Sequence, residues 1–437
     1  MMRAGFSRRD ITPPDTLVAS GGVPLAGYGV TRAAAGVHDR LYARALALSP
    51  VKGRASGVVV LLVLDALYLD GLCMDAIYRG VAAFGLTPDQ LLVNCIHTHS
   101  SFGGIFDASK GVNRAMTALL GAATPALVDL LVSESLAAIK EAIGNAENAP
   151  EASLRAARGE LEGLGSNRHD PKIESDGRIL ALELICGGRK ILLYNLSCHP
   201  TVMNADNLFL SADFPGAAAA ELERDFDGVI FINGAAGDMS TRFTRRESYF
   251  TECARYGKIM AERAGALLQN APERTLETAS LDYHTLSLRA AAVPGEKTAC
   301  AGLDGALQNL EALKAENAGA QKIRVAESLV EGARMNLLRA RYGGDEAELV
   351  NVRTGIVRIN DITALCVPFE LFSTLALPLI RKTNCAVFGY ANEYQGYLAD
   401  SAAHDNGDYE ALSSRFARGE GEKYITALRN CFPAKTP

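Results

Sequence analysis

The sequence contains no tryptophan, and only seven of its 437 residues are histidine. The lack of tryptophan weakens any case for a surface on which sugars stack. Basic residues are not in excess, since the formal net charge is −6, whereas a phosphate-binding surface needs clustered lysine and arginine. These features exclude a nucleic-acid partner and favour a small-molecule or lipid-like one.

Other signals are missing as well. The nine cysteines contain no CxxC pair and lie in mostly apolar contexts between Cys73 and Cys431, which fits reduced, packed thiols better than disulfides or a zinc knuckle. No stretch reaches the roughly 18 uninterrupted apolar residues of a transmembrane helix. The first residues hold no apolar run of the length that a secretory signal requires. We therefore expect a cytoplasmic protein without a transmembrane segment.

Hydrophobic residues make up 48% of the chain, which is ample for a buried core. Continuous apolar runs are typical of strands covered on both faces, and these occur at 57–65, 91–97, 179–185, 190–199, 228–234, 362–370 and 385–394. Helical patterns lie between many of them, as at 125–146. The alternation predicts an α/β fold with a mixed sheet flanked by helices.

The region 302–341 differs from the rest. Leucines and alanines recur there at helical spacing on both sides of the sequence AENAGA, which predicts an inserted helical hairpin whose role is packing. The chain shows no repeat, low-complexity tract or clear linker. We therefore expect a single domain over residues 1–437.

Two histidines, His97 and His99, stand one residue apart at the end of the run 91–97. Residues two apart on a strand face the same side, so one pocket can use both. A pair of hydrogen-bonded structural histidines is an equally ordinary reading. His199 and Glu370 also end apolar runs, and an unpaired glutamate is costly to bury. Together these strand ends supply the ligand types of a catalytic zinc site.

Two further segments are candidates for the same site. The glycine-rich turn 231–242 places Asp238 and Ser240 after a strand, where backbone N–H groups can face a ligand. The segment 390–410 offers four tyrosines in a polar, loop-like context, where exposed rim positions are the ordinary reading and a phenol beside a metal is the functional one. They are Tyr390, Tyr394, Tyr397 and Tyr409.

The order of these motifs resembles the N-terminal catalytic domain of neutral/alkaline, non-lysosomal ceramidases. The similarity covers nearly the whole chain, and HTHS followed by HPT and GD-S in this order is far more specific than any one part. The segments that carry it are AGFSRRDITPP, GYG, GVHDRLYARALAL, IHTHSSFGG, SNR, NLSCHPTVMN, SADFPG, NGAAGDMS, VPFELFS and YANEYQGY.

The resemblance implies a zinc-dependent amide hydrolase. It implies that Zn²⁺ is bound by His97, His199, Glu370 and Tyr397. It also implies that His99 faces the substrate with Arg168 and Tyr409, that Ser240 belongs to the active-site region, and that Asp238 lies beside it as a supporting residue. Zinc in such a site lowers the pKa of a water to roughly 7 for attack on an amide carbonyl. His99 then protonates the leaving amine, and Tyr409 stabilises the oxyanion.

The chain departs from the family pattern at a few positions. Ser101 and Phe102 replace the usual proline and glycine after HTHS, and Thr241 replaces the proline after GD-S. We expect the protein to lack the export signal and the C-terminal immunoglobulin-like domain that are usual in the family. The expected substrate is therefore an N-acyl compound of ceramide-like type, with its acyl chain and headgroup left open.

Three alternatives remain at this stage. A barrel-type metal amidohydrolase also uses an HxH motif, but it needs further histidines at later strand ends. A non-catalytic relative would keep the zinc and capture a lipid or a saccharide. A thiol nucleophile at Cys95 or Cys198 is disfavoured because Cys198 and His199 point to opposite faces of a strand.

Overall fold

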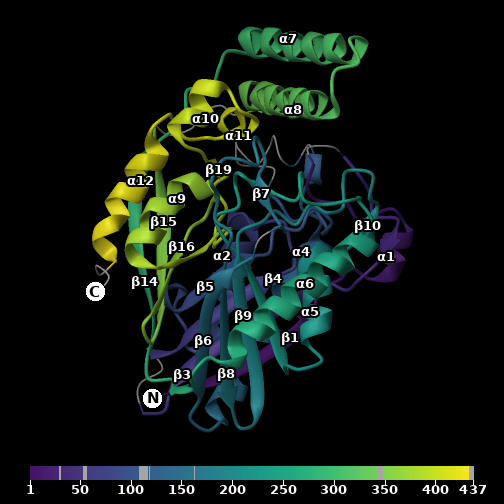
Figure 1. The fold of residues 1–437 in the computed structure, drawn as a ribbon. Coiled ribbons are helices and arrows are strands. Elements are labelled where there is room, and N and C mark those ends of the chain that lie inside the picture. The colour runs from purple at the N-terminus through teal and green to yellow at the C-terminus, as the bar shows by residue number, and fades with distance from the viewer. Residues whose placement is uncertain are drawn as a thin grey trace.

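Most of the apolar runs become strands in three mixed sheets, rather than in one. The computed structural model describes residues 1–28, 31–52, 57–107, 117, 119–161, 163–342 and 348–432 (Figure 1). The first sheet has the order β1-β3-β4-β5, the second β11-β9-β8-β6-β13 and the third β14-β15-β16-β18. Each contains one parallel pair, namely β4 with β5, β11 with β9, and β16 with β18, and its other pairs are antiparallel.

The strands have the following bounds. In the first sheet they are β1 Met2–Asp10, β3 Tyr42–Pro50, β4 Val59–Leu64 and β5 Leu91–Cys95. In the second they are β6 Ser153–Glu160, β8 Arg178–Cys186, β9 Arg189–Leu196, β11 Gly228–Asn233 and β13 Arg274–Thr275. In the third they are β14 Ala279–Arg289, β15 Leu349–Ile359, β16 Ile362–Cys366 and β18 Ala386–Phe388. Short pairs join β10 Phe209–Leu210 to β2 Gly36–Val37, β12 Met239–Ser240 to β7 Ser166–Asn167, and β17 Glu370–Leu371 to β19 Tyr397–Leu398.

The helices have the following bounds. They are α1 Asp15–Ala19, α2 Gly71–Val81, α4 Pro125–Glu147, α5 Asp213–Leu222, α6 Phe250–Gln269, α7 Glu296–Ala315, α8 Ala320–Tyr342, α9 Ser373–Thr383, α10 Ser401–Asn406, α11 Tyr409–Ser413 and α12 Glu420–Leu428. Three short 3₁₀ turns occur at Ala82–Phe84, Pro88–Gln90 and Arg429–Cys431. Helices α4 and α6 pack against the sheets, whereas α7 and α8 lie at one end of the molecule (Figure 1).

The first two sheets pack face to face between helices. Helix α4 packs on β1 and β3 of the first sheet, α6 packs on β6 and β8 of the second, and β11 contacts β1, β4 and β5 across the interface. Helix α4 starts at Pro125, a residue well suited to a first helical turn, and buries Leu127, Leu131 and Ile139. Gly5 permits the contact with α4, because a Cβ atom there would lie 2.2 Å from the carbonyl oxygen of Ala142.

The predicted hairpin is present and slightly longer than expected. Helices α7 and α8 span 296–342 and bury Leu310, Ala326 and Val330 between them. Figure 1 shows the pair at one end of the molecule, with α8 nearer to α10 and α11, and α8 packs on α11. The α/β fold with flanking helices and an inserted hairpin is thus confirmed, whereas the division into a single domain stays a prediction.

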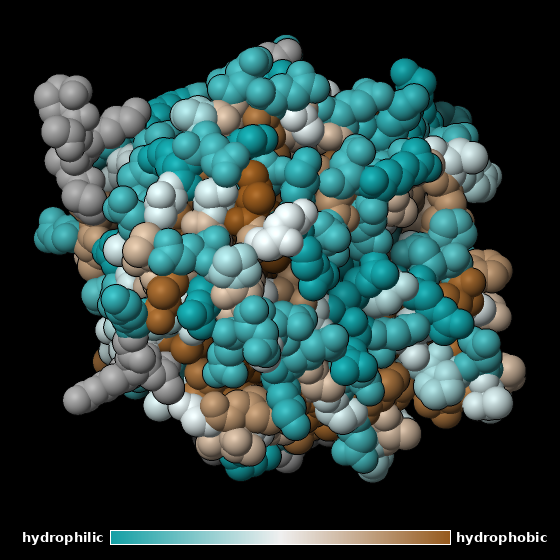
Figure 2. All heavy atoms as spheres, turned by 90° about the horizontal axis from the view of Figure 1, so that it is seen from below, coloured by the Kyte–Doolittle hydropathy of each residue, from teal (hydrophilic) through white to brown (hydrophobic). Residues whose placement is uncertain are grey.

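The surface carries no large apolar area on the face opposite the hairpin. Figure 2 shows this face covered mainly by hydrophilic side chains, with apolar ones in small separate groups. Within the described ranges, none of the helices is both long and apolar enough to cross a membrane.

Three buried asparagines join the ends of the three sheets. Asn94 in β5 donates to the carbonyl of Gly389, after β18, at 2.8 Å. Asn195 in β9 donates to the carbonyls of Ile232 and Val387, both at 2.9 Å, and Asn233 at the end of β11 donates to the carbonyl of Ile96 at 3.2 Å. Because an unpaired buried carbonyl is costly, these amides fix how the strand ends of different sheets lie together.

This role of the asparagines can be tested at Asn195. We expect Asn195→Ala to lower the free energy of unfolding by about 2–4 kcal/mol, because two buried carbonyls lose their donor and a cavity remains. Urea unfolding followed by circular dichroism measures the change. The matched control is Asn148→Ala, which removes an amide that donates to Gly144 on the surface and should cost less than about 1 kcal/mol. Equal losses in both variants would contradict the role of Asn195.

Candidate metal centre

His97 lies just beyond the first sheet rather than on its strand. Strand β5 ends at Cys95, and His97 has a φ of 69°, in the left-handed region that costs energy for a non-glycine residue. Its Nδ1 lies 2.9 Å from the carbonyl oxygen of Leu67, and its ring stacks on Tyr390 at 4.0 Å between centroids. The backbone turn therefore directs Nε2 of a buried imidazole away from the sheet.

His199 and Glu370 come from the other two sheets and meet His97. His199 follows β9, and its Nδ1 lies 2.6 Å from the carbonyl oxygen of Ala236. Glu370 is 4% exposed and lies in the short strand β17 that follows β16, not at an exposed helix start. Its Oε2 lies 2.7 Å from Nε2 of His199 and 3.1 Å from Nε2 of His97.

The hydrogen bonds of the two imidazoles show which atoms face the centre. Since Nδ1 of each ring donates its proton to a backbone carbonyl, the neutral form of each presents a lone pair at Nε2. Two lone pairs and a carboxylate oxygen repel one another unless a cation lies between them. Donor atoms on a tetrahedral zinc ion are roughly 3.3 Å apart, given bonds of about 2.0–2.1 Å. The observed distances and the buried donor set therefore fit a divalent cation.

The carboxylate and the imidazoles shift one another electrostatically. Burial alone would raise the pKa of Glu370, but His97 and His199 outweigh it and hold the pKa well below its usual range. Burial lowers the pKa of His199, which Glu370 only partly offsets. Glu370 is thus ionised and His199 favours the neutral form, as metal ligands must be.

His99 joins this group but differs from the other two histidines. Its Nε2 lies 3.3 Å from Nε2 of His97, and His97, His99 and His199 each offer a nitrogen within 4.8 Å of the others. Its Nδ1, however, is buried without a hydrogen-bond partner among the described residues. Burial, followed by repulsion from His97 and His199, holds the pKa of His99 well below its usual value. His99 is therefore a neutral imidazole without the supporting acceptor that zinc-binding histidines usually have.

The four tyrosines of the segment 390–410 are buried or partly buried rather than exposed. Tyr390 and Tyr397 are 1% and 7% exposed. Glu370 pairs directly with Tyr397 in the parallel ladder of β17 and β19, and the hydroxyl of Tyr394 donates to Oε1 of Glu370. Burial and the charge of Glu370 raise the pKa of both Tyr394 and Tyr397. Tyr394 was only one of four tyrosine candidates in the sequence, and it makes the direct contact with Glu370.

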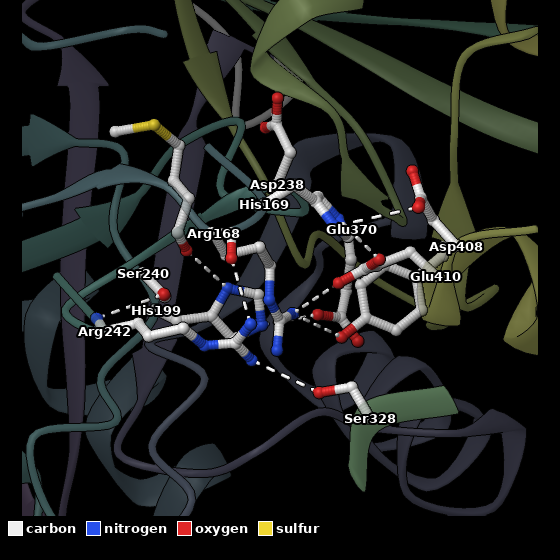
Figure 3. A network of polar contacts seen from close by, with 12 residues as sticks. Arg168, His169, His199, Asp238, Ser240, Arg242, Ser328, Glu370, Asp408 and Glu410 are labelled. Carbon is white, nitrogen blue, oxygen red and sulfur yellow. Dashed lines mark hydrogen bonds and ion pairs between the residues drawn. The ribbon is translucent and has the colours of Figure 1, made fainter. Parts of the chain in front are cut away.

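Arg168 belongs to a buried ion-pair network beside the centre (Figure 3). Its Nη1 lies 3.0 Å from Oε1 of Glu410 and 3.4 Å from the hydroxyl of Tyr397, and its guanidinium lies 5.7 Å from the ring of Tyr409. His169 pairs with the other oxygen of Glu410 at 2.9 Å. Arg168 therefore positions Tyr397 and Tyr409, and its ion pair with Glu410 is buried rather than on the surface.

Sequence reasoning missed His169 and Glu410. Both were adjacent to named residues, in SNRH and DYE. A buried glutamate needs a partner, but the polar sequence around Glu410, HDNGDYEALSS, does not mark it as buried. The pairing of His169 with Glu410, 241 positions further along the chain, could not be read from one sequence.

The glycine-rich turn supports the centre through its carbonyls rather than its N–H groups. Ala236 and Met239 both present their carbonyl oxygens to Nδ1 of His199. Gly237 lets the turn approach β17, because a Cβ atom there would lie 2.4 Å from the carbonyl oxygen of Glu370. Ser240 forms a backbone bridge with His199, and its hydroxyl accepts from the N–H of Arg242 at 3.2 Å.

Asp238 holds two of the site's loops together. It accepts from the backbone N–H of Ser373 at 2.5 Å, at the start of α9, and from the amide of Asn167 at 3.2 Å. One contact fixes the segment after Glu370 and the other fixes the residue before Arg168. These contacts fit the supporting place expected for Asp238.

Two of the alternatives find no support in the geometry. The three larger sheets have open strand orders in the described residues, unlike a barrel of eight parallel strands. Cys198 is buried with its Sγ 3.5 Å from the carbonyl of Leu164, and burial raises the pKa of Cys95 and of Cys198, which disfavours a thiolate nucleophile.

Comparison with known proteins agrees with the motifs. Residues 2–253, more than half of the chain, match the family described as neutral/alkaline non-lysosomal ceramidase, N-terminal. The chain belongs to this family. No curated protein sequence matches it.

Two solved structures share the fold of this ceramidase-family protein over its whole length. The crystal structure of neutral ceramidase from Pseudomonas aeruginosa is 18% identical, with a TM-score of 0.74, and the match covers 100% of this chain and 75% of that one. A ceramidase complexed with C2 is 16% identical, with a TM-score of 0.73, and the match covers 100% and 76%. The shared fold thus includes Glu370, Tyr397 and Tyr409, which lie beyond residue 253.

The buried carboxyl of Asp238 should make stability depend on pH. Burial raises its pKa from an ordinary 3.8 to about 6. The folded state therefore binds this proton more tightly than the unfolded state, so the stabilisation is complete below about pH 4 and is lost as the pH rises through about 6. We expect Asp238→Asn to remove a fall of about 3 kcal/mol between these values. Urea unfolding of both proteins at several pH values measures it, and parallel curves would contradict the assignment.

Proposed function

We propose that the protein is a zinc-dependent hydrolase that cleaves the amide bond of an N-acyl, ceramide-like substrate. The observation that carries this proposal is the Glu370 carboxylate, which lies against Nε2 of His97 and of His199 while both Nδ1 atoms are held by backbone carbonyls. Membership of a ceramidase family supports amide hydrolysis as the reaction.

His97, His199 and Glu370 would hold the ion, with Tyr397 as the fourth ligand beside Glu370 in the ladder. His99 is within reach of the same centre, but its unpartnered Nδ1 favours a role in proton transfer over one as ligand. When bound, zinc supplies a Lewis acid that polarises a carbonyl and lowers the pKa of water to about 7.

The chain's own residues supply the proton transfer. His99 is neutral because burial and its two histidine neighbours lower its pKa. It can therefore accept a proton at Nε2, the nitrogen that faces the centre, as water attacks the carbonyl. The same proton can pass to the leaving amine, which is too basic to depart unprotonated. A base with a lowered pKa returns its proton readily.

Tyr409 and Arg168 would orient the reacting carbonyl. Burial raises the pKa of Tyr409, so its hydroxyl keeps its proton and can donate a hydrogen bond to a developing oxyanion. Arg168 lies 5.7 Å from the Tyr409 ring and is tied to buried Glu410. It therefore keeps Tyr397 and Tyr409 in place. Ser240 acts through the backbone that carries His199.

The positions that depart from the family pattern are buried and satisfied locally. Ser101 donates to the carbonyl of Thr98 and Thr241 to that of Thr201, while Phe102 pairs with Leu25 through a backbone bridge. These substitutions alter loop packing rather than chemistry. A cytoplasmic location stays a prediction, and the acyl chain and headgroup of the natural substrate stay open.

Metal analysis together with substitutions tests the proposal. We expect the purified protein to contain about one zinc ion per chain, and His199→Ala to lose it. His99→Ala should keep the metal and lose about 10²–10⁴-fold in kcat on N-acyl amides, as is typical for a proton-transfer residue. Released amine and elemental analysis provide the two readouts.

The matched control is His284→Ala on β14, away from the centre, which should change neither readout. A protein that keeps its zinc but hydrolyses none of a panel of N-acyl amides would be a binding relative rather than an enzyme. Loss of metal in His99→Ala would instead make His99 a ligand.

A further inference from the structure

Arg242 occupies an unusual position at the edge of the centre, two residues after Ser240. Its Nη1 donates to the carbonyl of Arg168 at 2.9 Å, and its Nη2 donates to the hydroxyl of Ser328 at 3.4 Å. Figure 3 shows it reaching from the glycine-rich turn towards Ser328 on α8. The inserted hairpin therefore contributes to the wall of the site, beyond the packing role expected for it.

Arg242 forms no ion pair among the described residues, and the charges of Glu410 and Glu331 only partly offset its burial and the neighbouring positive charges. Ion pairs in the described residues join Arg168 to Glu410 and Arg324 to Glu327 and Glu331, and none of them reaches Arg242. Burial, followed by repulsion from Arg168 and Arg324, lowers the pKa of Arg242 to about 9. A half-buried cation among like charges is costly unless an anion binds beside it.

Two more arginines lie on the His99 side of the centre. Arg32 is 8% exposed and donates to the carbonyls of His99 and Asn207, and Arg245 donates to the carbonyl of Thr201. The ion pairs found within the described ranges include neither of them. The ring of Tyr28 lies 4.8 Å from that of His99, close to the charges of Arg32 and Arg245.

The charge of Asp206 acts on Arg32 and that of Asp213 acts on Tyr28, and Asp213 offers little compensation. Both oxygens of Asp213 accept backbone N–H groups, from Met203 and Phe214, and burial raises its pKa to about 6. A protein with a formal net charge of −6 thus concentrates unpaired guanidinium groups around one site. A uniformly neutral substrate gives no reason for this.

Resting on the proposed amide hydrolysis, we propose that Arg242 and Ser328 form an anion subsite that binds a carboxylate or phosphate group carried by the substrate. The two side-chain hydrogen bonds of Arg242 leave three of its five N–H donors for a ligand. A planar guanidinium pairs with either oxyanion through two parallel hydrogen bonds. The subsite makes an acidic N-acyl compound a better substrate than a neutral one of equal chain length.

Matched substrates test this directly on the zinc-loaded, full-length protein. The neutral reference is N-hexanoylethanolamine. N-hexanoylglycine carries a carboxylate on the amine side of the amide. The O-phosphate of N-hexanoylethanolamine carries a phosphate on the same side. The N-ethyl monoamide of adipic acid carries a carboxylate on the acyl side. The preference is the kcat/KM of an acidic amide divided by that of the neutral one, and the arm with the highest preference identifies the anion and its side.

We expect a preference above about tenfold for one acidic arm, and a fall of about 10- to 100-fold in that preference in Arg242→Gln, as for the loss of a charge-assisted hydrogen-bonded pair. Arg242→Lys should recover part of it, and Ser328→Ala should weaken it. Because the preference is a ratio, any loss of activity that the acidic and the neutral substrate share in a variant cancels. The matched control is Arg246→Gln, an exposed arginine four residues further along the chain, which should leave the preference unchanged.

A second readout does not need turnover. Inorganic phosphate and N-hexanoylglycine should raise the Tm of the parent protein and of Arg246→Gln, but not that of Arg242→Gln, because binding to the folded state stabilises it. If the parent and Arg242→Gln hydrolyse amides with the same preference for acidic substrates, the proposed anion subsite is wrong, whereas the proposed hydrolase activity is supported. If no amide is hydrolysed, the proposed function fails, and the Tm shifts alone decide the subsite, which is wrong if Arg242→Gln keeps them.

Discussion

The position of the candidate site depends on the hydrogen bonds of three buried side-chain amides, those of Asn94, Asn195 and Asn233. Each donates to a backbone carbonyl of a neighbouring sheet, at or just beyond a strand end. His97, His199 and Glu370 follow strands of three different sheets, so no single sheet positions the centre. These hydrogen bonds hold the strand ends of the three sheets together, and we call the joined strand ends the platform. Once that platform forms, the loops beyond it need to span only a few residues to bring two imidazoles and a carboxylate together.

Backbone strain near the centre has the same origin. His97, Tyr390 and Asn392 all have φ near +60°, and each lies in a loop just after a strand that the platform holds. A non-glycine residue keeps such a conformation only where its surroundings impose it. The stability of the sheets thus maintains a local geometry that is unfavourable by itself, and this geometry turns the His97 ring onto Tyr390 and towards the carboxylate.

The sequence predicts much of the fold because burial leaves a strong pattern. Runs such as 57–65 and 228–234 become buried strands, and the leucine spacing at 302–341 becomes a helical pair. The grouping of strands into three sheets could not be predicted, because the bonds that define it join residues far apart in the chain. The strand alternation used for His97 and His99 was the wrong reason for a correct proximity, since both residues lie beyond β5.

Part of the candidate site could be predicted, because a histidine or glutamate at the end of an apolar run is costly to bury without a partner. His97, His199 and Glu370 carry this signal, and the structure brings them together. His169 and Glu410 lie in polar sequence and do not carry it, so only their pairing in the structure reveals them. Arg242 gave no signal at all, because an arginine in a glycine-rich turn is ordinarily solvated. Its role depends on Arg168, which follows β7, and on Arg324 and Ser328, which both lie on α8.

The hairpin that carries Ser328 leaves and re-enters the third sheet at adjacent positions, because Arg289 at the end of β14 pairs with Leu349 at the start of β15. Without the hairpin, a short turn could close these two strands while their register stayed unchanged. The insertion is therefore closed off from the sheet at its base, and the wall of the site that it forms could differ in length or sequence without any change in the pairing of β14 and β15.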